Sequence, residues 1–260
     1  MATYYIIAAG SNLGVQDPGN VNGYPQVNAG TVITAQPGDV FIVDNGFNAS
    51  TTIQTTLGGS APVEVQFNQS ITGLTATNQA AITFTGGVIP TVNIAAAVDA
   101  DSVQLIGTAS DGITVNVADG ATVGQIFGSP DTDVITAGNG VTFNGIVLND
   151  STTATVSVGD NVTFNTQVTM NALNSTMSLT AGDNALFNTD INIPGNFSDK
   201  TVSLGSGATV NGSVNMFGDG VAGDLNTMTF TAGADLTVTG NVVMASNYGN
   251  TTFLAGDNAS

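Results

Sequence analysis

Short stretches in which apolar and polar residues alternate recur along the second half of the chain. Each stretch holds an apolar-x-apolar triplet, a tight corner, a second triplet, another corner and a third triplet. The copies cover residues 113–127, 134–148, 156–170, 177–193, 202–216 and 228–244, with a partial copy at 251–260. Alternation with a period of two indicates a β-strand that has one buried and one exposed face. The pattern therefore predicts many short strands joined by tight corners.

The spacing of the copies predicts how the strands are arranged. Equivalent corners follow one another at intervals of 20 to 28 residues, most of them 20 to 23. One copy has too few apolar positions to form its own core, so consecutive copies must stack. We therefore expect an all-β fold, a β-solenoid (parallel β-helix) with about 20–23 residues per coil. An antiparallel β-sandwich is the alternative, because it also consists of short alternating strands.

The alternation also identifies the side chains that should point inward, each contributing roughly 1.5–3 kcal/mol when buried. They are Val141, Phe143, Ile146, Leu148, Val156, Val158, Val162, Phe164, Val168, Met170, Met177, Leu179, Phe187, Ile191, Ile193, Val202, Leu204, Val210, Val214, Met216, Met228, Phe230, Leu236, Val238, Val242 and Met244.

The first half of the chain is less regular. Residues 31–127 contain similar short strands with degenerate corners, and we assign residues 31–260 to one solenoid whose regular repeats begin at about residue 113. The last coil is expected to be incomplete at Ser260. Residues 1–30 are rich in Gly and Pro, which indicates a loop-rich N-terminal lead-in or cap over the open coil edge.

Charge and composition exclude several classes of partner. The chain has 19 acidic residues, one cation (Lys200) and a net charge of -18, with no His and no Cys. Nucleic acids and anionic membranes need basic surfaces, so neither is expected as a partner. No run of 18 apolar residues predicts a membrane span. Residues 1–10 lack a basic n-region, so the chain either stays inside the cell or leaves by a route that does not read an N-terminal signal. We expect the second, an extracellular or cell-surface protein exported without an N-terminal signal peptide.

The same composition argues against catalysis. The chain offers no His general base, no Cys nucleophile and no Arg to stabilise an oxyanion. We therefore expect that it is not an enzyme. A polysaccharide-acting solenoid enzyme stays an alternative, because glycoside hydrolysis needs only two carboxyl groups.

Two columns of polar residues recur at the corners. Asn144, Asn165, Asn188 and Asn211 occupy one equivalent position, which predicts a structural Asn ladder of stacked amides, with ligand binding as the alternative. The second column follows the glycine corner and consists of Asp119, Asn139, Asp160, Asp183, Ser206, Ala234 and Asp257. Its Asp and Asn residues suit corners, because they tolerate left-handed backbone and cap their own chain. The alternative is cation binding between adjacent carboxylates, since Ca²⁺ takes oxygen ligands.

Three acidic pairs are candidate metal ligands, because Ca²⁺ prefers oxygen ligands. The pairs are Asp99 with Asp101, Asp131 with Asp133, and Asp219 with Asp224. The segment GSPDTDVITAGNG, residues 128–140, resembles one unit of the calcium-binding repeats of exported bacterial proteins. Ca²⁺ is thus the cofactor that we expect.

The coils GDNVTFNTQVTM, GSGATVNGSVNM and AGADLTVTGNVVM resemble the β-solenoid repeats of bacterial surface proteins. These include autotransporter passengers, adhesins and S-layer proteins exported by type I systems. The unfinished last coil indicates either a chain cut from a longer protein or an open coil that meets another subunit. Together with the resemblance, this favours a self-assembling subunit of an S-layer or surface filament, assembled with Ca²⁺ and forming a homopolymer by stacking of coil ends. The alternative is an adhesin stalk that binds a cell-surface glycan. An ice-binding solenoid would need a regular Thr-x-Thr column, and we expect none here.

Overall fold

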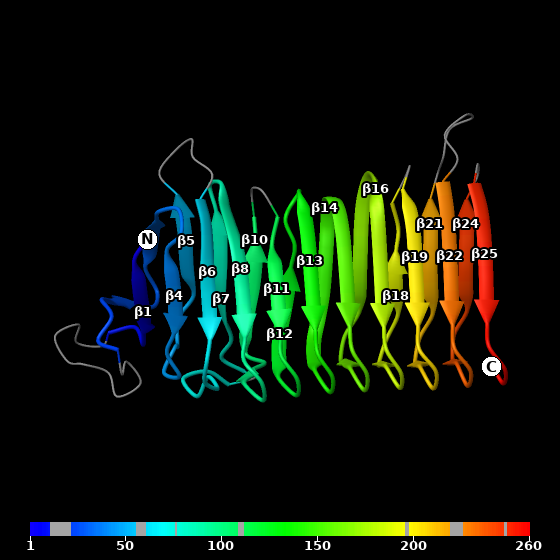
Figure 1. The fold of residues 1–260 in the computed structure, drawn as a ribbon, viewed down its shortest axis with the longest axis horizontal. Coiled ribbons are helices and arrows are strands. Elements are labelled where there is room, and N and C mark those ends of the chain that lie inside the picture. Colours follow the sequence, from blue (N-terminus) through cyan, green and yellow to red (C-terminus); the bar gives the residue numbers. More distant parts are fainter. Residues whose placement is uncertain are drawn as a thin grey trace.

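The computed structural model describes residues 1–10, 22–55, 61–75, 77–108, 112–195, 198–218, 226–246 and 249–260, without the side chains of residues 150, 151 and 172–175. These residues form a rod of about nine stacked turns of ~23 residues, which confirms the β-solenoid. Strands lie side by side across the long axis, with the two chain ends at opposite ends of the rod (Figure 1). The described part of the chain contains no helix that could span a membrane.

The strands make three faces along the rod. Face A consists of β2 (Gln26–Asn28), β1 (Thr3–Ile7), β4 (Val40–Val43), β6 (Ala61–Phe67), β8 (Val88–Ile94), β11 (Thr114–Val117), β13 (Thr132–Ala137), the second halves of β14 (Thr142–Val158) and β16 (Val168–Ala181), β19 (Asp199–Leu204), β22 (Asn226–Ala232) and β25 (Gly249–Ala255).

Face B consists of β3 (Val32–Ala35), β5 (Thr51–Thr55), β7 (Ala80–Thr85), β10 (Val103–Gly107), the second half of β12 (Thr122–Phe127), middle and early parts of β14 and β16, β18 (Ile191–Ile193), β21 (Val214–Gly218) and β24 (Val242–Ser246). The short face C consists of β9 (Asp99–Ala100), the starts of β12 and β14, β15 (Thr163–Phe164), β17 (Leu186–Phe187), β20 (Thr209–Val210) and β23 (Thr237–Val238).

The pairing between coils is parallel. Within the ladders each residue lies beside the equivalent residue of the next coil, as Val156 beside Leu179 and Leu179 beside Val202 show. The one isolated antiparallel bridge among the described residues joins Thr75 and Asn78, outside the named strands. This arrangement excludes the antiparallel β-sandwich.

One continuous core runs through the rod, and the inward set predicted from alternation is buried within it, apart from its last members. Val238, Val242 and Met244 are only partly buried, because they belong to the last coils, which lack a covering coil on one side. Aromatic rings stack along the axis inside the core. Phe143, Phe164 and Phe187 form a column with ring centroids 5.3 and 4.6 Å apart.

The N-terminal segment contributes strands of its own. β1 pairs with β4, so Tyr4 lies beside Phe41 and their rings stack 5.4 Å apart. β2 lies on the other side of β1 and pairs Gln26 with Tyr5. Part of residues 1–30 is therefore joined to face A by the same parallel pairing as the later coils. The boundary at residue 30 stays a prediction.

The single cation lies inside the core. Lys200 points inward on face A between Met177 and Met228 of the neighbouring coils, and its side chain is 0% exposed. Its Nζ donates hydrogen bonds to the carbonyl oxygens of Gly195 (2.7 Å) and Ser198 (3.2 Å). Burial lowers the pKa of Lys200 to about 8, while the charge of Asp199 opposes the shift.

The pKa of Lys200 predicts a pH dependence of folding. Between pH 8 and 10.5 the unfolded chain keeps a proton on Lys200 that the folded chain has lost. The free energy of unfolding should therefore rise across this window by at most roughly 3 kcal/mol, and this lysine should have no further effect below it. Lys200→Met should abolish this rise, because Met already occupies the equivalent position in both neighbouring coils.

Urea unfolding of both proteins from pH 7 to 11 measures the difference, and the titration of tyrosines cancels in the comparison. Equal pH slopes in the wild type and the variant would contradict the assignment.

Candidate functional site

The Asn ladder lies on the outer side of the corner that follows face C. Each amide donates from Nδ2 to Oδ1 of the preceding coil: Asn165 to Asn144 at 3.1 Å, Asn188 to Asn165 at 3.3 Å and Asn211 to Asn188 at 3.4 Å. Asn144 donates in turn to the carbonyl oxygen of Asp101 at 3.0 Å. The four amides therefore hydrogen-bond to one another along the axis, as in a cross-β stack, and hold coils in register.

A second ladder runs along the glycine corner that follows face A. Asp119 Oδ1 accepts the backbone N–H of Asn139 at 2.8 Å, and Asp160 Oδ1 accepts that of Asp183 at 2.9 Å. The same contact recurs in the next coils. Asn139 Oδ1 accepts the backbone N–H of Asp160 at 2.8 Å, and Asp183 Oδ1 accepts that of Ser206 at 2.7 Å. Each stacked side chain therefore contacts a backbone donor above it.

This ladder explains why glycine precedes the corner residue. A Cβ atom on Gly138 would lie 2.0 Å from Asp119 Oδ1, and one on Gly182 would lie 2.2 Å from Asp160 Oδ1. The sequence suggested left-handed backbone at the column residues themselves. In the structure, the residue that follows each column residue has the left-handed backbone instead. Asn161 and Asn184, each with φ of 57°, occupy this left-handed position.

Two of the three acidic pairs, Asp99 with Asp101 and Asp131 with Asp133, lie in the described part of the chain. Asp99 accepts hydrogen bonds from the Thr122 hydroxyl and the Asp101 N–H, and Asp101 accepts one from the Ser102 hydroxyl at 2.7 Å. Asp219 and Asp224 lie outside the described residues. Among the residues that are described, no group of three acidic, His or Cys side chains is arranged to hold a metal ion.

Asp131 and Asp133 lie in different environments. Asp133 points into the core, is 0% exposed, and accepts hydrogen bonds from the N–H groups of Ile113 and Ser129 at 3.1 Å. Asp131 stays at the surface and accepts the Thr152 hydroxyl at 2.9 Å. The carboxylate of Asp133 therefore satisfies backbone donors of its own coil and the coil before it. The expectation of Ca²⁺ at these residues stays a prediction.

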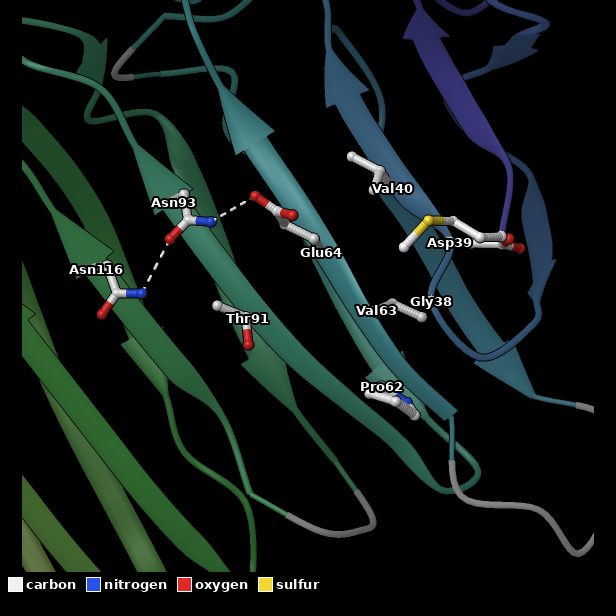
Figure 2. A pocket seen from close by; sticks show the side chains of 10 residues that line it. Gly38, Asp39, Val40, Pro62, Val63, Glu64, Thr91, Asn93 and Asn116 are labelled. Atoms are coloured by element: carbon white, nitrogen blue, oxygen red, sulfur yellow. Dashed lines mark hydrogen bonds between the residues drawn. The ribbon is translucent and has the colours of Figure 1, made fainter.

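A shallow groove of about 380 Å³ lies near the N-terminal end of the rod. Figure 2 shows three of its polar side chains in a row, with Asn93 donating to Glu64 at 2.7 Å and Asn116 donating to Asn93 at 2.9 Å. Val63 and Pro62 line the same groove. A carboxylate, two amides and an apolar strip are groups that a hydroxyl-rich ligand could contact, and a glycan partner stays a prediction.

The C-terminal end of the rod is open. Phe253 of β25 stacks on Phe230 at 5.2 Å on one side, yet half of its surface is exposed. A hollow of about 400 Å³ is lined by Val242, Met244, Thr251 and Phe253. Inward-facing side chains of the last coil are therefore in contact with solvent.

Among the described strands of face A no strict Thr-x-Thr column is present, but outward columns that mix Thr and Ser are. On face A, Thr229 and Thr231 of β22 lie beside Thr201 and Ser203 of β19, and this pairing of hydroxyl residues recurs from coil to coil. The repeats vary in length, so the columns are hidden when the sequence is aligned by its corners. Aligning the strands by their inward residues would have shown them.

Known proteins offer no guide to the role of these features. No protein-family model, no curated protein and no solved structure matches this chain. The geometry of the described residues must therefore carry the functional argument.

The corner ladder predicts a coupling between two residues of neighbouring coils. Gly138→Ala should destabilise the fold by roughly 1–3 kcal/mol, because its Cβ overlaps Asp119 Oδ1 and other contacts of that Cβ are no closer than 3.1 Å. Asp119→Ala should cost about 1 kcal/mol through the lost hydrogen bond. The double variant should be more stable than the sum of the two effects predicts.

Urea unfolding of the four proteins completes this double-mutant cycle. The equivalent position one coil earlier is already occupied by an alanine, Ala118, so the fold accepts alanine at this type of corner. If the free-energy changes of the two single variants simply added up in the double variant, the Asp119 carboxylate would not be the reason for a glycine at position 138.

Proposed function

We propose that this protein is an extracellular structural protein whose copies assemble end to end, as the subunit of an S-layer or surface filament. The observation that carries the proposal is the apolar coil surface at β25, where Phe253 is half exposed beside an apolar hollow. Burying such side chains is favourable in proportion to the apolar area that is removed from water. The resemblance of the coils to exported bacterial repeats supports the extracellular location.

The N-terminal end offers the matching edge. β2 begins face A and β3 begins face B, and each pairs on one side only among the described strands. A second copy that places its β2 beside β25 and its β3 beside β24 would continue two faces with the same parallel pairing. Unpaired N–H and C=O groups at both edges favour such strand addition.

Because the two ends differ, the contact is head-to-tail, and a head-to-tail contact that does not close produces a filament or lattice.

Charge opposes this assembly. Each copy carries a net charge of -18, so neighbouring copies repel one another. Salt screens such repulsion over a length of about 10 Å at 0.1 M. We assign Ca²⁺ the role of a cation between copies, because a divalent ion takes oxygen ligands and can bridge the carboxylates of two acidic surfaces.

Replacing the exposed end residue should prevent polymerisation. Phe253→Lys should leave the protein monomeric, because a cation at the hollow cannot be buried against the next copy. Phe217→Lys is the matched control, since Phe217 is 42% exposed and points outward on β21, which β24 already covers. Electron microscopy and sedimentation velocity distinguish filaments from monomers.

Both substitutions reduce the negative charge equally, so charge alone should promote assembly in each. Filaments of the Phe253→Lys protein as long as those of the control would refute end-to-end stacking, as would a wild type that stays dispersed under all salt conditions.

Assembly should also depend on ionic conditions. Raising NaCl should lengthen the filaments, and Ca²⁺ should do so at a much lower concentration, because a divalent ion both screens and bridges carboxylates. Light scattering during parallel titrations with NaCl, CaCl₂ and MgCl₂ measures the effect. Assembly that weakens as salt rises would contradict repulsion as the opposing force.

A further inference from the structure

The outer surface of face A carries a two-dimensional grid of hydroxyl side chains from β13 to β25. Three outward columns run along the axis, and Thr or Ser fills every position except Val134, Asp199, Asn250 and Leu254. The columns are Thr132, Thr153, Thr176, Asp199, Thr227 and Asn250; then Val134, Thr155, Ser178, Thr201, Thr229 and Thr252; then Thr136, Ser157, Thr180, Ser203, Thr231 and Leu254.

The spacing of the grid follows from the solenoid. Stacked strands lie about 4.8 Å apart, and alternate residues of one strand lie about 6.6 Å apart. The register on this face continues without a shift from Thr153 onward, since the irregular pairings precede that residue. Figure 1 shows these strands side by side and nearly aligned in direction. The hydroxyl groups therefore repeat on a nearly rectangular lattice.

The grid is almost uncharged although the protein is strongly acidic. Asp199 is its one ionised residue, and its carboxylate accepts hydrogen bonds from the N–H (2.8 Å) and hydroxyl (2.7 Å) of Thr227. Within the described structure the hydroxyls of Thr155, Thr180 and Thr201 donate to no other residue, so they are available to solvent. Thr is stiff at χ1, so each methyl and hydroxyl keeps a fixed direction.

The grid presents the same groups at every coil. A partner can contact all coils alike only if its own groups repeat with the same spacing. Small ligands prefer concave sites where polar groups converge, and this grid spreads its polar groups over successive coils. Polyanions and polycations would need a charged surface. Hexagonal ice presents donors and acceptors at repeat distances close to those of the grid, and it carries no charge.

We propose that the Thr/Ser grid of face A binds the surface of ice. The methyl groups exclude loosely held water while the hydroxyls hold ordered waters at fixed positions, and waters that bridge two surfaces can replace direct hydrogen bonds. The grid covers the side of the rod from β13 to β25, and its central strands lie between other coils. Ice binding by these strands does not require end-to-end assembly.

The test uses the purified full chain and one matched pair of variants. Thr201→Tyr places a bulky ring in the centre of the grid, whereas Thr209→Tyr places the same ring on face C of the same coil. Both positions face outward on strands, where Tyr is well tolerated, and circular dichroism verifies the fold. The measurements are thermal hysteresis, ice recrystallisation, and adsorption of labelled protein to a single ice crystal.

The wild type and Thr209→Tyr should show thermal hysteresis and coat defined planes of the crystal, and Thr201→Tyr should lose most of both activities. Phe253→Lys should bind ice as the wild type does, which separates this proposal from the assembly proposal. A wild type without hysteresis or adsorption would overturn the proposal. Equal losses in both Tyr variants would also overturn it, as would a grid-dependent adsorption to crystalline cellulose that is absent on ice.

Discussion

The hydrogen-bonded stacking of each coil on the next is the interaction on which the rest of the structure depends. No coil has a core of its own, so apolar side chains are buried only when the neighbouring coil lies above them in register. The pairing of Val156 with Leu179 and of Leu179 with Val202 is one example of a column that extends through the rod. Core, corners and surface columns all inherit their spacing from this pairing.

Stacking places equivalent residues above one another, and this favours some side chains over others. Amides and aromatic rings gain from it, as the Asn144–Asn211 ladder and the Phe143–Phe187 column show. Like charges should repel, and at the corner ladder each Asp contacts a backbone N–H of the next coil instead of a second carboxylate. Lys200 stands alone among methionines and pairs with backbone carbonyl groups.

The same translational repeat links the two proposals. At the end of the rod it leaves a coil edge beside the half-exposed Phe253, which the assembly proposal covers with a second copy. Along the side of the rod it produces the hydroxyl grid of face A, for which a periodic partner is the natural complement. One proposal concerns the direction along the axis, and the other concerns a surface parallel to it.

The sequence by itself determined the all-β class, the parallel stacking and most of the buried residues, because alternation and repeat length are local properties of the chain. It also contained the inward position of Lys200, which follows from extending the alternation back from Val202 and Leu204. Only the tertiary structure decided which outward residues lie side by side. Coils differ in corner length, so the register between coils, which creates the Thr/Ser grid, is fixed by backbone pairing between residues that are distant in the sequence.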